Sequence, residues 1–159
     1  MSSSISAVET DVFKVSSVQV QQSHLILQPP AYLIFTLFHS PSILHKDTIH
    51  CGFHLIPHLV STVLSTLPSS AYAIITDTNV GPLFLPALQS AFESAIAESG
   101  VKSRLLTRQV SPGEEAKSRE VKAELEDWLL EERCTRDTVI LALGGGVIGD
   151  LAGFVAATL

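Results

Sequence analysis

The sequence predicts an α/β fold in which a parallel sheet carries helices on both faces. Apolar runs rich in β-branched residues alternate with segments whose apolar residues recur at helical spacing, which is the pattern of βαβ units. A glycine-rich turn at residues 144–146 joins the last such run to the last helix, and Asp77 follows an earlier run. We expect both turns at the edge formed by the carboxyl ends of the strands, where such sheets bind ligands.

One helix and one strand are predicted before the Asp77 turn. Apolar residues recur at near-helical spacing over residues 53–66, with Pro57 in the first turn, where its missing N–H costs no hydrogen bond. Residues 72–76 form a short apolar run typical of a buried strand. The apolar positions of the helix are Leu55, Leu59, Val63 and Leu67.

A second helix and a second strand follow the Asp77 turn. Gly100 is the predicted C-cap of this helix, because glycine adopts the left-handed conformation that ends many helices. Residues 101–107 are the next strand candidate. The apolar face of the helix consists of Leu85, Leu88, Phe92 and Ile96.

A third helix and a third strand lead to the glycine turn. The pair Pro112-Gly113 turns the chain, and we expect Glu114 and Glu115 to favour the positive N-terminus of the helix that follows. Residues 138–143 are the strand before the glycines. The apolar face of this helix consists of Val121, Leu125, Trp128 and Leu129.

The glycine turn matches the pattern G-x-G-x-x-G at Gly144, Gly146 and Gly149. In that pattern one glycine permits the tight turn, one lets a pyrophosphate approach the backbone, and one lets the helix pack close to the sheet. The N-terminus of the helix adds partial positive charge. The alternative is a glycine-rich turn that binds nothing. The dinucleotide pattern also expects an acidic residue about 20 positions further on, and the sequence ends before that point.

Composition and charge restrict the classes of partner that the protein can have. The 159 residues suit one domain, and the net charge of −6 with no basic stripe argues against nucleic acid. The apolar burst at residues 31–38 is much shorter than the roughly 20 residues of a membrane span. Cys51 and Cys134 have no C-x-x-C spacing, so we expect a reduced, cytoplasmic compartment.

Two other groups of residues carry weaker signals. His50, His54 and His58 recur every four residues, but no carboxylate stands among them, so we interpret them as solvated or packed histidines rather than zinc ligands. Cys134 has no His–Asp pattern beside it that would activate a thiolate.

Three segments, in the same order along the chain, resemble those of 3-dehydroquinate synthases. They are LGGGVIGDLAGF at residues 143–154, TDTNVG at residues 76–81 and SPGEEAKS at residues 111–118. The residues around these segments most resemble the sequence of the synthase domain of the fungal pentafunctional AROM polypeptide. The resemblance implies the N-terminal, Rossmann-like domain of the dehydroquinate-synthase-like fold, a parallel sheet flanked by helices.

The resemblance also implies an activity. The family converts 3-deoxy-D-arabino-heptulosonate 7-phosphate to 3-dehydroquinate and phosphate in the shikimate pathway of aromatic amino acid biosynthesis. It uses NAD and a divalent metal, usually zinc, and it is usually a cytoplasmic homodimer. The small-molecule substrate is a sugar phosphate, and no membrane or nucleic acid takes part.

Nine residues correspond to NAD contacts of the family. By resemblance, Asp77, Thr78 and Asn79 contact the adenosine side, Glu114 and Lys117 contact the nucleotide from the Pro-Gly-Glu loop, and Gly145, Gly146 and Val147 line the phosphates with Asp150 close by. The alternative for Asp77 is an Asx residue that only caps its turn. The metal ligands of the family, a Glu and two His, would lie beyond Leu159, so no catalytic or metal residue is assigned and we expect no turnover by this chain alone.

The resemblance divides the chain at residue 42. Residues 1–42 are expected to be an irregular N-terminal segment, with the family's opening strand at residues 12–15 and a candidate insertion at about residues 16–41. By the same resemblance, residues 43–159 are expected to be an incomplete NAD-binding domain without the family's C-terminal metal and substrate domain.

Two alternative functions stay open. One is a related sugar-phosphate cyclase or an iron-type alcohol dehydrogenase, although the Gly146-Val-Ile-Gly-Asp150 segment and the Pro-Gly-Glu loop favour the synthase. The other, from a different class, is a non-catalytic NAD-binding fragment.

Overall fold

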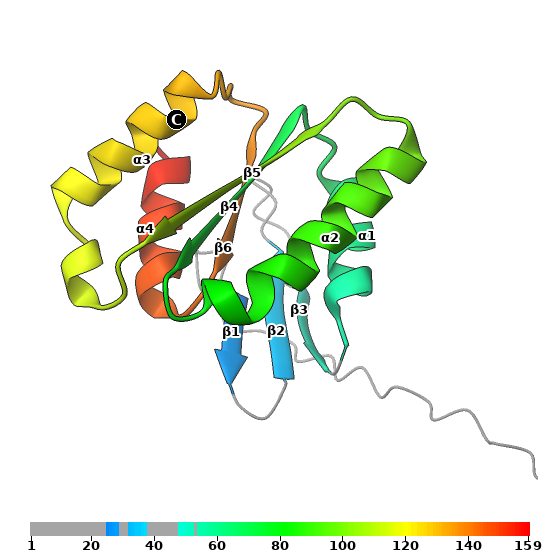
Figure 1. Ribbon diagram of the computed structural model, residues 1–159, viewed down its shortest axis with the longest axis horizontal. Coiled ribbons are helices and arrows are strands. Elements are labelled where there is room, and N and C mark those ends of the chain that lie inside the picture. The colour runs from blue at the N-terminus through cyan, green and yellow to red at the C-terminus, as the bar shows by residue number, and fades with distance from the viewer. Residues whose placement is uncertain (1–24, 29–31, 38–47, 53) are drawn as a thin grey trace, which may run out of the picture.

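The computed structural model describes the backbone of residues 25–28, 32–37 and 48–52 and all atoms of residues 54–159. These residues form a sheet in the order β3-β2-β1-β6-β4-β5, with α1 and α2 on one face and α3 and α4 on the other (Figure 1). The strands are β1 (Leu25–Gln28), β2 (Tyr32–Leu37), β3 (Thr48–Gly52), β4 (Ala71–Asp77), β5 (Arg104–Val110) and β6 (Val139–Leu143). The helices are α1 (Ile56–Thr66), α2 (Gly81–Ser99), the 3₁₀ turn η1 (Glu114–Ala116), α3 (Arg119–Glu131) and α4 (Gly146–Ala156).

The expected parallel α/β arrangement is confirmed around β4. This strand lies between β5 and β6 and pairs in parallel with both. All seven of its residues are buried, as a strand must be when helices cover both faces of its sheet.

Alternate residues of β4 supply two separate hydrophobic cores. Tyr72 and Ile74 face α1 and α2, and the Tyr72 ring lies 5.7 Å from that of Phe92. Ala73 and Ile75 face α3 and α4, where fully buried leucines and small residues pack. The two-residue period of the strand therefore fixes both helix layers.

The N-terminal part of the sheet consists of three antiparallel strands, two of which lie within residues 1–42. β1 pairs with β2 and β2 with β3, both antiparallel, and Leu25 pairs in parallel with Leu143 of β6. The apolar burst is rich in aromatic and β-branched residues, which favour strands. The division at residue 42 stays a prediction, and the strand expected at residues 12–15 lies outside the described residues.

Two element boundaries were predicted wrongly. β5 begins and ends three residues later than the expected strand at residues 101–107. Glu114 and Glu115 lie in η1, and α3 begins only at Arg119, because the Ser118 hydroxyl accepts a hydrogen bond from the Val121 N–H at 3.2 Å and caps the helix there. The second helix does end at Gly100, whose φ is 66°.

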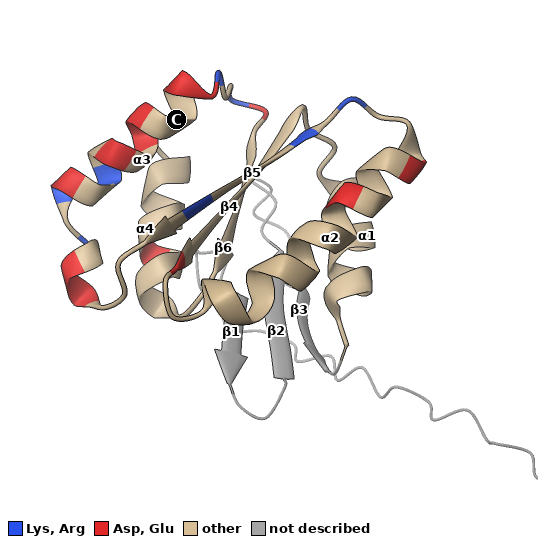
Figure 2. Ribbon diagram, in the orientation of Figure 1, with Lys and Arg blue, Asp and Glu red and all other residues tan. Residues whose placement is uncertain are grey.

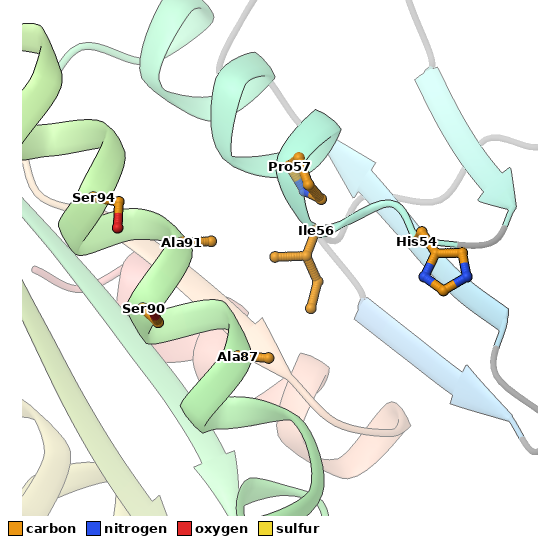
Figure 3. A pocket seen from close by; sticks show the side chains of 7 residues that line it. All are labelled: His54, Ile56, Pro57, Ala87, Ser90, Ala91 and Ser94. Atoms are coloured by element: carbon orange, nitrogen blue, oxygen red, sulfur yellow. The ribbon is translucent and has the colours of Figure 1, made fainter.

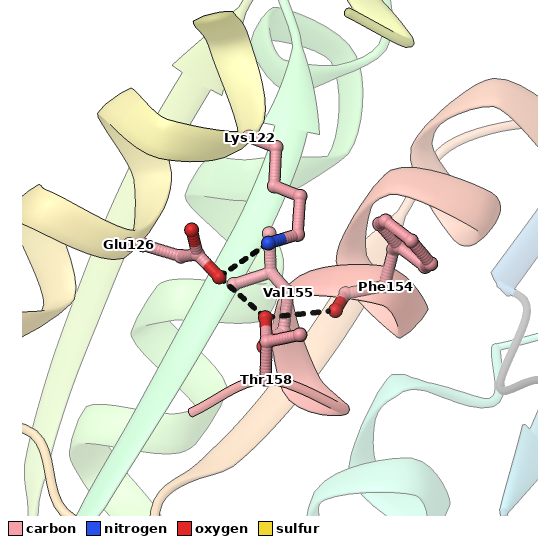
Figure 4. A network of polar contacts seen from close by, with 5 residues as sticks. All are labelled: Lys122, Glu126, Phe154, Val155 and Thr158. Carbon is pink, nitrogen blue, oxygen red and sulfur yellow. Dashed lines mark hydrogen bonds and ion pairs between the residues drawn. The ribbon is translucent and has the colours of Figure 1, made fainter. Parts of the chain in front are cut away.

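Polar contacts tie α4 to α3 at the end of α4 (Figure 4). The Lys122 ammonium pairs with the Glu126 carboxylate and lies 5.3 Å from the centre of the Phe154 ring. The Thr158 hydroxyl donates to the same carboxylate. These contacts lower the pKa of Glu126, chiefly through Lys122 and then Thr158. They fix the helix that begins at the glycine turn.

The distribution of charge on the described elements is uneven. Figure 2 shows acidic residues gathered on η1 and α3, whereas basic residues are scattered. In the part of the chain that the structure describes, no helix combines the length and hydropathy of a bilayer span.

A hydrogen-bond network joins the loops that enter the three parallel strands. The Ser69 hydroxyl donates to the Asp137 carbonyl at 2.6 Å, and the Ser103 hydroxyl donates to the Ser69 carbonyl at 2.7 Å. The Asp137 carboxylate accepts from the Thr135 hydroxyl and, at 2.9 Å, from the Ser70 N–H. These two donors lower the pKa of Asp137 from 3.8 to about 2.

The lowered pKa makes a prediction for stability against pH. The carboxylate stabilises the fold above pH 3.8, and this contribution is lost as the pH falls toward about 2. We expect Asp137→Asn to lower the urea midpoint at pH 7 and the difference from the parent chain to shrink at pH 2.5. Asp127→Asn, at an exposed position of α3, is the control. An equal loss of stability at both pH values would contradict this account.

Candidate functional site

The carboxyl ends of β4, β5 and β6 form one edge of the sheet. Thr76 pairs with Leu143 and Asp77 pairs with Val110, so the three strands end within one residue of the same level. The Asp77 turn and the glycine turn start here, as the sequence predicts, and so does the Pro-Gly-Glu loop after β5.

Asp77 builds the turn between β4 and α2. Only 8% of its surface is exposed, and Oδ1 accepts hydrogen bonds from the Asn79 and Val80 N–H groups at 2.8 Å each. The Thr78 N–H donates to the Val110 carbonyl at 3.1 Å, which joins the turn to β5. The Asx role is therefore present in the structure, and the exposed side chains of this turn are those of Thr78 and Asn79.

Sequence reasoning missed a contact between this turn and β5. A Cβ atom on Gly81 would lie 2.9 Å from Gln109 Oε1 and 3.2 Å from Thr76 Cγ2, so glycine is the residue that fits at the start of α2. Gln109 thereby lies beside the Asp77 turn. No sequence pattern marks it, because its position follows from the pairing of β4 with β5. The fully buried Thr76 hydroxyl makes no hydrogen bond.

The three glycines of the turn have different surroundings. A Cβ on Gly144 would lie 2.8 Å from Ile148 Cγ1, whereas a Cβ on Gly145 or Gly146 would meet no atom within 4 Å. Among the described glycines only Gly100 and Gly113 have positive φ, so backbone conformation does not demand glycine at residues 144–146. Close packing accounts for Gly144. Gly145 and Gly146 leave open space in front of α4.

The N-terminus of α4 faces that open space. Its N-cap is Gly145, which has no side chain to accept a hydrogen bond from the first turn. Uncapped N–H groups together with the positive end of the helix dipole form a receptor for an anion. Val147 lies half-buried in this first turn.

Lys117 joins the Pro-Gly-Glu loop to α4. Its ammonium lies 2.9 Å from Asp150 Oδ2 and 3.2 Å from Glu114 Oε2. Hydrogen bonds to Asp150 and then to Glu114 raise the pKa of Lys117, so the side chain is a cation at physiological pH. Three residues from two sequence segments thus meet beside the glycine turn.

The predicted nucleotide residues therefore share one edge, and the structure groups them in two sets. Asp77, Thr78 and Asn79 lie at the end of β4, while Glu114, Lys117 and Asp150 cluster beside Gly145, Gly146 and Val147. Their roles toward a ligand stay predictions.

The described residues contain no group of three His, Cys, Asp or Glu side chains that could hold a metal ion. His54 and His58 are exposed at the start of α1. His54 also lines a groove of about 400 Å³ between α1 and α2 (Figure 3). The other side chains of this groove belong to Ile56, Pro57, Ala87, Ser90, Ala91 and Ser94. None of them is a predicted site residue.

Comparison with known proteins shows strong similarity over most of the chain. A family model described as "3-dehydroquinate synthase N-terminal" matches residues 107–159. The pentafunctional AROM polypeptide of Yarrowia lipolytica is 54% identical over 117 residues, which are 73% of this chain and 8% of that polypeptide. That of Pneumocystis carinii is 52% identical over 117 residues, 74% of this chain and 7% of that polypeptide. The chain thus spans less than a tenth of the length of these relatives.

A solved structure shares the fold. The crystal structure of 2-deoxy-scyllo-inosose synthase complexed with carbaglucose-6-phosphate, NAD⁺ and Co²⁺ is 24% identical to this chain, with a TM-score of 0.53. The match covers 63% of this chain and 27% of that protein.

The different surroundings of Gly144 and Gly146 predict that an added methyl group has different effects on stability at the two positions. We expect Gly144→Ala to cost about 1–3 kcal/mol, because the branched Ile148 side chain occupies the place of the new Cβ. Gly146→Ala is the matched control, which should be neutral or stabilising by up to about 1 kcal/mol since alanine favours the helix. Urea unfolding of both variants measures the two values, and an equal cost would rule out the packing role of Gly144.

Proposed function

Since the chain belongs to the 3-dehydroquinate synthase family, with residues 107–159 matching the N-terminal part, we propose that it supplies the NAD-binding part of a 3-dehydroquinate synthase. The observation that carries the proposal is the ion pair of Lys117 with Asp150, one turn after Gly146 in α4, together with the open space at Gly145 and Gly146. A cation beside free N–H groups is the chemistry that a pyrophosphate requires.

The residues divide the binding of the dinucleotide between them. The N–H groups of Gly146 and Val147 donate to the pyrophosphate, and the open space at Gly145 lets it approach the backbone. Lys117 adds a charge-assisted hydrogen bond. The exposed Thr78 and Asn79 side chains lie at the end of β4, where they can reach the adenosine ribose, and Asp77 holds their turn.

Bound NAD would accept a hydride from a substrate hydroxyl and later return it. The chain's own residues bind and orient the dinucleotide for this chemistry. The metal of the family has no fitting group of ligands among residues 54–159, so no step is assigned to it here. By the same family argument the substrate is 3-deoxy-D-arabino-heptulosonate 7-phosphate, and the assembled enzyme is a cytoplasmic homodimer.

A related sugar-phosphate cyclase is the second candidate. The fold similarity to 2-deoxy-scyllo-inosose synthase favours it, whereas the identity of about half of the aligned residues to AROM polypeptides favours the synthase. Both candidates use the same nucleotide edge. A non-catalytic NAD-binding protein would share the binding step alone.

The test is thermal unfolding of the purified chain with and without NAD. NAD at 100 times its dissociation constant stabilises the folded state by about 2.7 kcal/mol, so the midpoint must rise. We expect Gly146→Val to abolish the rise, because its branched side chain fills the open space before α4. Ser94→Ala, in the groove between α1 and α2, should leave the rise unchanged.

Two results would contradict the proposal. One is a cooperative transition that NAD does not move. The other is an NAD-induced rise that Gly146→Val leaves intact while Ser94→Ala removes it. That result would show that NAD binds in the groove between α1 and α2 instead.

A further inference from the structure

We propose that the side-chain amide of Gln109, at the carboxyl end of β5, binds the adenine base of the dinucleotide. The inference rests on the proposed function and adds a contact with the base to the contacts already assigned to the pyrophosphate and the ribose. Three neighbouring strands would then each supply one part of the nucleotide site.

The order of the strands places Gln109 where the base would lie. The pyrophosphate site of the proposed function follows β6, and the ribose residues Thr78 and Asn79 follow β4, the next strand in the sheet. β5 lies on the other side of β4. Neighbouring strands are about 4.8 Å apart, and in NAD the ribose stands between the pyrophosphate and adenine. A dinucleotide that follows β6 and then β4 therefore brings its base to the end of β5.

The sheet fixes the position of Gln109. Its backbone pairs with that of Thr76, and the carbonyl of the next residue, Val110, accepts the hydrogen bond from the Thr78 N–H at 3.1 Å. Leu105, four residues earlier on β5, packs against the core beneath α1 and α2. Because side chains alternate along a strand, Gln109 lies on this same face, beside the start of α2. A strand holds a side chain more precisely than a loop does.

The Gln109 amide is placed but makes no hydrogen bond. A Cβ on Gly81 would lie 2.9 Å from its Oε1 and 3.0 Å from its Cδ, so the absence of a side chain at Gly81 leaves the room that the amide occupies. The Gln109 side chain is exposed, and it has no hydrogen-bond partner among the residues that the structure describes. Both its donor and its acceptor are therefore available to a ligand.

A primary amide matches the hydrogen-bonding edge of adenine. Adenine presents the acceptor N1 beside the N6 amino donor, and a glutamine side chain offers one donor group and one acceptor at a similar spacing. Hypoxanthine presents an N1–H donor beside the acceptor O6, which the same amide can match after turning over. A carboxylate accepts only, so it suits the N1–H of hypoxanthine and meets the lone pair of adenine N1.

The test measures binding of ADP and of inosine diphosphate (IDP) to the full chain by titration calorimetry. We expect Gln109→Glu to weaken ADP binding about twofold to tenfold relative to IDP binding, the size of one hydrogen bond. The added negative charge repels both diphosphates alike, so the ratio of their dissociation constants removes that effect. Gln89→Glu, the same change in α2, is the matched control and should leave the ratio unchanged.

A second variant removes the amide without adding a charge. We expect Gln109→Leu to weaken ADP and IDP binding by the same twofold to tenfold, because the amide can match either base, and to leave the binding of inorganic pyrophosphate as in the parent chain. A glutamine that only packed against Gly81 would change the thermal midpoint of the variants but not the ratio of ADP to IDP affinity. If Gln109→Glu does not fold, Gln109→Leu decides alone.

The outcomes separate this inference from the proposed function. A parent chain that binds neither NAD nor ADP refutes the proposed function and the adenine contact with it. ADP binding for which Gln109→Glu keeps the parent ratio, or shifts it in favour of ADP, overturns the adenine contact while the function stands. So does a folded Gln109→Leu chain that retains its full affinity for ADP.

Discussion

The parallel register of β4 between β5 and β6 is the constraint on which the rest of the structure depends. It brings Asp77, Val110 and Gly144 to one level, although they are far apart in the sequence. It also sends alternate β4 side chains into the two cores that hold the helices. The loops that enter the three strands are joined by Ser69, Ser103 and Asp137, so one end of the sheet is fixed while the other carries the open surface.

Local sequence patterns predicted the elements that form mainly through interactions between residues close in the sequence. Periodicity identified the parallel strands and the main helices, and glycine chemistry identified the end of α2 at Gly100. The boundary at Arg119 was missed because the Ser118 cap outweighs the preference of two glutamates for a helix N-terminus. The β1–β2 hairpin was not predicted because the pairing of two strands depends on contacts between separate segments, which composition alone does not specify.

The candidate site was predicted as a set of residues but not as an arrangement. Resemblance supplied the residues, and the sheet topology placed them at one edge. The contact of Lys117 with Asp150 and the position of Gln109 beside Gly81 depend on distances between separate elements, which no spacing in the sequence encodes. The same holds for Gly144, whose requirement comes from the Ile148 side chain rather than from its own backbone.

The absent side-chain cap at Gly145 links ligand binding to local order. The first turn of α4 closes through the hydrogen bond from the Gly149 N–H to the Gly145 carbonyl at 3.0 Å, and the N-cap Gly145 has no side chain to accept from the N–H groups before it. Such a turn opens more readily than the rest of the helix. An anion that accepts these N–H groups acts as the missing cap, so amide hydrogen exchange in this one turn slows in proportion to occupancy and reports it without any probe on the ligand.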